Sequence, residues 1–157
     1  MRPVSDVTEA EALVDRDLAN RALAARLRAY APYSNFFVGA ALLCDDGTIV
    51  EGCNVENASY GLCCCAERTA VGSAVAAGKR HFTRIAIATA ASPPAPPCGM
   101  CRQVLAEFLT DANDDLHITL LNDRGEQIVT TLRGIFPGIF DTKQLASGQI
   151  APAKGSP

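Results

Sequence analysis

The sequence predicts a three-layer α/β/α domain in which helices cover both faces of a central mixed sheet of five strands. Its 157 residues are the length of one domain with a substantial core. Apolar residues make up 48% of the chain and charged residues 20%, as in ordinary soluble globular proteins. The expected order of elements is helix, hairpin, helix, strand, helix and two strands, and strands separated by helices form a sheet with helices packed on it.

The first expected element is a long helix. Asp6 followed by Glu9 is typical of a helix start of the capping-box kind, with Asp in place of Ser. Apolar residues continue the pattern to about Tyr30, and Pro32 would stop the helix. We assign this helix to packing.

A hairpin is expected next. Residues 37–44 form an apolar run, residues 49–55 form a second one, and the turn between them contains Asp46-Gly47. An Asp-Gly pair between two apolar segments is a strong hairpin signal. The remaining expected elements are a helix over residues 66–77, a strand over 84–90, a stiff proline-rich loop over 92–97, a helix from 98 to about 109, and strands over 116–121 and 127–132.

We expect a single domain over residues 1–140 and a C-terminal tail, residues 141–157, that is partly disordered. Residues 148–157 contain two prolines, two glycines and one large apolar residue, which is too little apolar surface to fold.

Charge and hydropathy exclude several classes of function. The net charge is −3 and Lys and Arg form no run, which argues against nucleic acid as the main partner. No apolar stretch approaches the roughly 20 residues of a membrane span, and the N-terminus lacks a signal-peptide pattern. Seven cysteines without a secretion signal favour a reducing, cytoplasmic location, where metal binding is more common than disulfides.

Three of the cysteines predict a zinc site. Cys98 and Cys101 stand three residues apart, on one face of a helix start, and Pro97 suits the first helical position. Cys65 opens the other helix, and helix N-termini favour thiolates. Zinc with three protein ligands keeps a fourth position for water, which is typical of a hydrolytic site.

Glu67 is the candidate catalytic residue. It lies two positions after Cys65, close enough for its carboxylate to exchange protons with water at the metal. Cys64 as a fourth ligand would instead close the site and make it structural.

Other cysteines and the two histidines have ordinary interpretations. Cys44 and Cys53 are expected to be small buried hydrophobes in strands. His81 and His117 have no ligand partner at short spacing, so we expect them at the surface or at strand ends.

Four separate motifs carry a resemblance to a known family. They are Tyr-Ala-Pro-Tyr-Ser-Asn-Phe with Val-Gly-Ala-Ala-Leu (residues 30–36 and 38–42), Gly-Cys-Asn-Val-Glu-Asn-Ala-Ser-Tyr-Gly (52–61), Cys-Ala-Glu-Arg-Thr-Ala (65–70), and Pro-Cys-Gly with Cys-Arg-Gln (97–99 and 101–103). Over residues 14–140 the chain resembles the cytidine deaminase family, in particular its short homotetrameric branch with three zinc-binding cysteines. The cysteine and glutamate spacing is also the pattern described for zinc deaminases in general.

The resemblance implies a function and roles for further residues. It implies hydrolytic deamination of cytidine, and of 2′-deoxycytidine, in pyrimidine salvage, with one Zn²⁺ per subunit and a homotetramer whose sites are shared between subunits. Phe36 would pack on the pyrimidine, Asn54 and Glu56 would bind the ribose, and Tyr60 would reach a neighbouring subunit's site. Arg68 would compensate the negative charge of the three thiolates, and Arg102 is a second candidate for this role.

Other functions stay open at the level of sequence. The nearest is a deaminase of a modified cytosine nucleoside, of the blasticidin type. A deaminase that edits RNA or DNA is disfavoured by the acidic balance, and binding to single-stranded oligonucleotides would reveal it. A structural zinc module would show four sulfur ligands on metal analysis.

Overall fold

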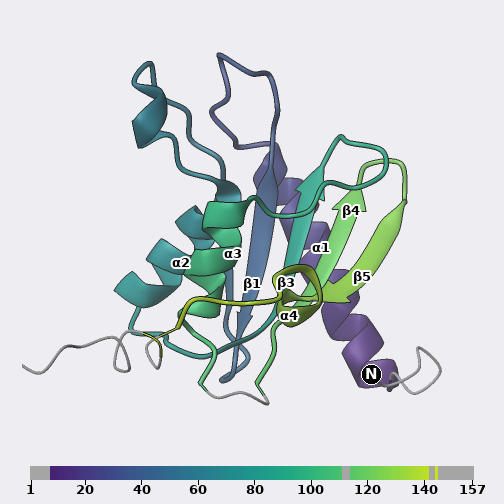
Figure 1. Cartoon of the computed structure of the whole chain (residues 1–157). Helices are drawn as coiled ribbons and strands as arrows, with labels where there is room; N and C mark the ends of the chain where they lie inside the picture. The colour runs from purple at the N-terminus through teal and green to yellow at the C-terminus, as the bar shows by residue number, and fades with distance from the viewer. Residues whose placement is uncertain (1–7, 111–113, 142–143, 145–157) are drawn as a thin grey trace, which may run out of the picture.

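A five-stranded sheet runs through the middle of the computed structural model, which describes residues 8–110, 114–141 and 144 (Figure 1). The strands are β1 (Gly39–Cys44), β2 (Ile49–Cys53), β3 (Phe82–Thr89), β4 (His117–Asn122) and β5 (Gln127–Thr131). Their order is β2-β1-β3-β4-β5, and β3 and β4 are parallel while the other neighbours are antiparallel. The predicted mixed sheet of five strands is therefore confirmed.

Helix α1 (Glu9–Arg26) covers one face of the sheet and buries Leu18, Ala19 and Ala22 against it. Its predicted start was wrong. Thr8 caps the helix, because its side chain accepts from the Glu11 amide and the Glu11 carboxylate accepts from the Thr8 amide. The same capping box thus lies two residues later than expected, and Asp6 lies outside the described residues.

The same helix ends earlier than predicted, at Arg26 rather than near Tyr30. After a tightened turn at residues 27–29, the Tyr30 amide donates to the Asn54 carbonyl at 3.0 Å. Tyr30 also forms an isolated parallel bridge with Val55. Pairing with the segment after β2 therefore replaces the last helical turn, and it brings residues 30–38 beside residues 54–56.

Helices α2 (Ala66–Ala76) and α3 (Gly99–Ala106) cover the opposite face, which completes the three layers (Figure 1). Gly52 of β2 lets α2 approach closely, because a Cβ there would lie 2.4 Å from the Ala66 carbonyl oxygen and the Ala70 amide nitrogen. Gly39 of β1 does the same for α1, where a Cβ would lie 2.1 Å from the Ala22 carbonyl oxygen.

Helix α3 differs from the prediction at both ends. Cys98 is its N-cap, so Pro97 precedes the cap instead of occupying the first helical position, and the helix ends at Ala106, short of Leu109. Two short elements were not predicted, the 3₁₀ turn η2 (Tyr60–Leu62) and α4 (Leu132–Ile135). Three or four residues are too few to show helical periodicity.

The described residues contain no helix both long and apolar enough to cross a membrane. The predicted tail falls almost wholly outside them, so the division at residue 140 stays a prediction. What the fold settles is the position of the N-termini of α2 and α3, which lie side by side at one end of the sheet (Figure 1).

Candidate active site

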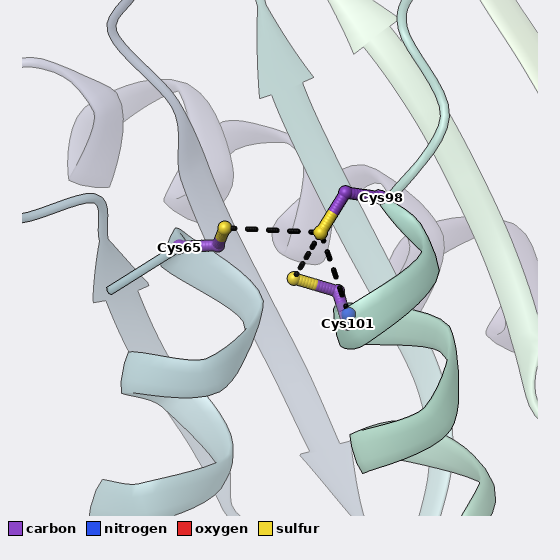
Figure 2. Close-up of side chains that lie close together, drawn as sticks. All are labelled: Cys65, Cys98 and Cys101. Carbon is purple, nitrogen blue, oxygen red and sulfur yellow. Dashed lines mark hydrogen bonds between the residues drawn. The ribbon is translucent and has the colours of Figure 1, made fainter. Parts of the chain in front are cut away.

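The sulfur atoms of Cys65, Cys98 and Cys101 converge between the N-termini of α2 and α3 (Figure 2). The Cys65 and Cys98 sulfurs are 3.9 Å apart, and those of Cys98 and Cys101 are 3.4 Å apart. All three ligand atoms lie within 4.8 Å of one another. Two sulfurs that each bind a tetrahedral zinc at about 2.3 Å are about 3.8 Å apart, so the cluster fits Zn²⁺.

The helix starts explain why these thiols are suited to a metal. Cys65 and Cys98 are both N-caps, and the Cys98 sulfur accepts a hydrogen bond from the Cys101 amide at 3.5 Å. Hydrogen bonding from the Cys101 thiol, with help from Cys98 and Arg68, lowers the pKa of Cys65 to about 6. The thiolate, which is the metal-binding form, is therefore accessible at neutral pH.

Arg68 lies where the expected charge compensation requires a cation. Burial lowers the pKa of its guanidinium, but the charges of Cys64 and of the three cluster cysteines outweigh burial and raise that pKa overall. One guanidinium nitrogen donates to the Cys63 carbonyl, while the buried Nε has no hydrogen-bond partner among the described residues. A buried N–H without a partner requires an acceptor, and the negatively charged sulfur cluster beside Arg68 suits that need.

Glu67 is buried in the first turn of α2, with only 4% of its surface exposed, and it borders the same pocket as Cys65 and Cys98. Burial, reinforced by the negative charge of Cys65, raises the pKa of the Glu67 carboxyl above its ordinary range. A shift in this direction brings the pKa of a carboxyl closer to neutral pH, where a general acid–base catalyst must both accept and return a proton.

A pocket of about 200 Å³ opens above the cysteines and Glu67. Its lining brings together residues from distant parts of the chain: Ser34, Phe36, Val38, Asn54, Glu56, Cys65, Glu67, Ile87, Thr89, Ala95, Pro96 and Cys98. The structure thus places three predicted substrate-binding residues, Phe36, Asn54 and Glu56, in one pocket with the catalytic candidate. The lining combines apolar side chains with a few polar ones, as sites for small molecules do.

Asn54 and Glu56 also hold the pocket wall together. The Asn54 amide accepts from the Val38 amide and donates to the Phe36 carbonyl, both at 2.8 Å. The Glu56 carboxylate accepts from the Tyr33 amide at 2.9 Å, the Ser34 amide at 3.2 Å and the Ser34 hydroxyl. The Ser34 hydroxyl in particular lowers the pKa of Glu56, so this carboxylate is ionised at neutral pH.

Tyr60 is the predicted site residue that this pocket does not include. Its side chain is 76% exposed and lies in a neighbouring hollow of about 280 Å³, lined by Tyr33, Ser34, Glu56, Tyr60 and Cys63. The rings of Tyr33 and Tyr60 meet edge to face, with centroids 6.1 Å apart. The two hollows share Ser34 and Glu56, so Tyr60 borders the site from outside.

Comparison with known proteins decides the family. The family model described as the cytidine and deoxycytidylate deaminase zinc-binding region matches residues 13–112. The chain belongs to the cytidine deaminase family.

Several relatives extend this match. A cytidine deaminase of Sporosarcina psychrophila is 47% identical over 78% of this chain and 88% of its own length. One of Halalkalibacterium halodurans is 44% identical over 82% and 95%. The crystal structure of a cytidine deaminase from Burkholderia pseudomallei superimposes with a TM-score of 0.74 at 50% identity, covering 80% of this chain and 98% of that one. A blasticidin-S deaminase of Bacillus cereus is more distant, at 30% identity over 64% of this chain.

These matches confirm the predicted family, the fold and the prediction that the chain is an enzyme of the deaminase type. The cysteine cluster, together with the zinc-binding region of the family model, supports zinc as the metal.

Cys44 and Cys53, which were predicted to be buried in strands, lie apart from the cluster. Cys44 is buried in β1, whereas Cys53 is only half-buried at the end of β2. His81 and His117 are exposed, as expected.

Sequence reasoning missed part of this deaminase pocket. Ser34 lies within the first motif, but only the fold shows that its hydroxyl also accepts from the Phe36 amide, at 3.0 Å. Thr89, Ala95 and Pro96 line the pocket from the end of β3 and the loop that follows it. Thr89 ends a buried strand, and parallel sheets commonly place their ligands at such strand ends, which was an available signal.

Proposed function

We propose that this enzyme converts cytidine and 2′-deoxycytidine, by hydrolysis, to uridine and 2′-deoxyuridine with release of ammonia. The observation that carries the proposal is the burial of Glu67 beside three convergent cysteine sulfurs, in one pocket with Phe36, Asn54 and Glu56. An acid–base carboxyl next to a metal site, facing an aromatic and two polar side chains, suits hydrolysis of a flat heterocycle attached to a sugar.

Cys65, Cys98 and Cys101 would hold the metal, one Zn²⁺ per subunit. Zinc with an open position makes water acidic enough to be a nucleophile at neutral pH. Glu67 would take a proton from that water and deliver it to N3 of the pyrimidine, so that C4 becomes electrophilic and the hydroxide left from the water forms a bond to C4. The same carboxyl would then take the remaining proton of the new C4 hydroxyl and carry it to the amino group, so that the C4–N bond breaks, ammonia leaves and C4 becomes a carbonyl.

Phe36 would pack against the base, while Asn54 and Glu56 would bind the sugar. Internal contacts already use both atoms of the Asn54 amide and three acceptor sites of the Glu56 carboxylate. A site rejects a substrate that lacks a hydroxyl when this leaves a buried polar group unpaired. Here the internal partners remain, which supports acceptance of the deoxyribonucleoside, with kcat/KM values for the two nucleosides within about tenfold.

Two alternatives have less support. The relatives named cytidine deaminase are more similar to this chain than the one named blasticidin-S deaminase. A small pocket and a net charge of −3 give little support for a polynucleotide substrate. Rates on cytidine and blasticidin S, and a gel-shift assay with single-stranded oligonucleotides, would separate the three.

We also propose a homotetramer in which subunits share their sites. Large apolar side chains are exposed in the two segments that supply Phe36 and Glu56 to the pocket: Tyr30, Tyr33, Phe36, Val55, Tyr60 and Leu62. Exposed apolar patches of this extent are typical of protein interfaces. Tyr60 would extend from such an interface into the neighbouring site. The reaction and the cysteine content fit a role in cytoplasmic pyrimidine salvage.

The decisive test is an ultraviolet assay for loss of cytidine absorbance. Zinc-loaded enzyme should turn over cytidine, a chelator should stop the reaction, and added Zn²⁺ should restore it. Absence of turnover on cytidine and deoxycytidine by protein that contains zinc would contradict the proposal.

A further inference from the structure

The proline-rich loop between β3 and α3 builds two parts of the site. Ala95 and Pro96 line the pocket, and Cys98 follows directly as a member of the sulfur cluster. Residues 93, 94, 96 and 97 are prolines, which have no amide hydrogen to donate and a fixed φ angle. The position of this stiff loop therefore depends on what holds its two ends.

At the first end, the buried side chain of Asn122 holds the loop. Asn122 is the last residue of β4, is 2% exposed, and pairs in register with Thr89 at the end of β3. Its Nδ2 donates to the Ala91 carbonyl at 2.9 Å and to the Glu126 carboxylate at 2.8 Å. The Glu126 carboxylate in turn accepts from the Ser92 hydroxyl at 2.9 Å.

The other side of the same amide faces the turn between β4 and β5. Its Oδ1 accepts from the Arg124 amide at 3.0 Å and from the Glu126 amide at 3.1 Å. All four hydrogen-bonding positions of this buried amide are thus in use. Its oxygen accepts two bonds from the turn, and its nitrogen donates one bond to the loop and one to the Glu126 carboxylate, which itself binds the loop. Loss of such a contact in a buried site is costly because the partner is left unpaired.

At the second end, Arg102 of α3 donates from Nε to the Pro97 carbonyl at 2.8 Å and from Nη1 to the Ile135 carbonyl at 2.7 Å. The loop is therefore fixed on both sides, to the sheet through Asn122 and to α3 through Arg102. Because four of the six residues 92–97 are prolines with a fixed φ, we expect a shift at Ala91 to reach Pro96 and Cys98.

We propose that Asn122 is a positioning residue of the active site, which sets the proline-rich loop so that Cys98 meets Cys65 and Cys101 and Pro96 closes the pocket. The inference rests on the proposed function for its catalytic meaning, but its main readout is the retention of zinc. Asn122 itself belongs neither to the sulfur cluster nor to the residues that line this pocket.

The test uses Asn122→Asp combined with Glu126→Gln in the zinc-loaded enzyme. The first change keeps the acceptor atoms that face the turn and removes donation to the Ala91 carbonyl, while the second prevents a clash of two carboxylates. Zinc release to a chromogenic chelator should become at least tenfold faster, and KM for cytidine should rise at least fivefold. Release within twofold of the wild-type rate would overturn the proposal.

Gly125→Ala is the matched control for a purely structural effect. Gly125 lies in the same turn with φ of +84°, which strains any residue with a Cβ, but its replacement leaves the Asn122–Ala91 contact in place. This variant should unfold at a lower temperature and release zinc at the wild-type rate. Equal release from Gly125→Ala and the double variant would show a structural role only and overturn the proposal.

Ser92→Ala gives an answer even if the double variant fails to fold. It removes only the exposed bond between Ser92 and Glu126. Zinc release two- to threefold faster than wild type supports the proposal, and an unchanged rate contradicts it. Failure of the proposed function would appear separately, as wild-type enzyme that holds zinc and does not turn over cytidine.

Discussion

Glu67 shows how one side chain gains its chemistry from its position. A carboxyl on the surface would be fully ionised at neutral pH, whereas burial at the start of α2, next to Cys65, raises the pKa of this one. The same helix start places Cys65 as the N-cap, so a single turn of helix fixes both the proposed metal ligand and the proposed proton carrier.

Replacing Glu67 with Gln should abolish most turnover and leave the metal and the fold intact. Gln has nearly the same shape but cannot carry the proton, and general acid–base catalysis of this kind typically contributes about 100- to 10,000-fold. Steady-state rates on cytidine, zinc content and thermal unfolding measure the three properties. Glu107→Gln, at the exposed end of α3, is the control and should behave as wild type.

Retention of more than about a tenth of the wild-type rate by Glu67→Gln would contradict this role. The loss of rate would then be smaller than the roughly 100-fold that general acid–base catalysis contributes at the least.

At the scale of helices and strands, the sequence did not reveal which residues pair with partners far away in the chain. The turn at Asp46-Gly47 and the helix starts at Cys65 and Cys98 depend on neighbours in sequence, so local patterns located them within one residue. The end of α1 was missed because Tyr30 pairs with residues more than twenty positions away. Likewise, the motifs indicated Phe36 and Glu56, but the Ser34 hydroxyl that joins them became visible only in the fold.

Close packing of β2 on α2 can be tested at Gly52. In Gly52→Ala the new Cβ would lie 2.4 Å from backbone atoms of Ala66 and Ala70, so the helix that carries Cys65 and Glu67 must move. Overpacking of this kind should lower the free energy of unfolding by about 3 kcal/mol. Chemical denaturation measures it, and cytidine turnover should fall with it.

Gly72→Ala is the opposite case in the same helix. Gly72 is exposed and a Cβ there meets nothing within 4 Å, so the change should stabilise the protein by about 1 kcal/mol through helix propensity. If both alanine variants shifted stability alike, the close approach of Gly52 to α2 would not be the cause.

At the scale of the molecule, a metal held by the cysteine cluster would join α2 and α3, two helices that come from separate segments of the chain. Chelation should therefore lower the unfolding temperature as well as stop turnover, since a ligand at a thousand times its Kd stabilises the folded state by about 4 kcal/mol. Differential scanning fluorimetry with and without chelator measures this shift, and Zn²⁺ should reverse it.

Two cysteine variants locate that effect. Cys98→Ser should lose the zinc-dependent shift, because Cys98 belongs to the sulfur cluster, while Cys53→Ser should keep it, because Cys53 lies apart at the end of β2. A full shift in Cys98→Ser would place the metal elsewhere.

The proposed sharing of sites between subunits makes a prediction that a monomeric enzyme cannot meet. Tyr60 is exposed beside the pocket and Glu67 is buried within it, so in a shared site the two residues come from different subunits. Tyr60→Ala and Glu67→Gln should each be poorly active alone. Mixed by co-refolding at equal amounts, they should form hybrid oligomers in which about a quarter of the sites are intact, because random assembly brings together an unchanged Glu67 and an unchanged neighbouring Tyr60 with that frequency. Cytidine turnover should rise to about a quarter of the wild-type value, and size-exclusion chromatography with light scattering should give four chains per particle. Activity that never exceeds the mean of the two separate variants would show that each subunit completes its own site.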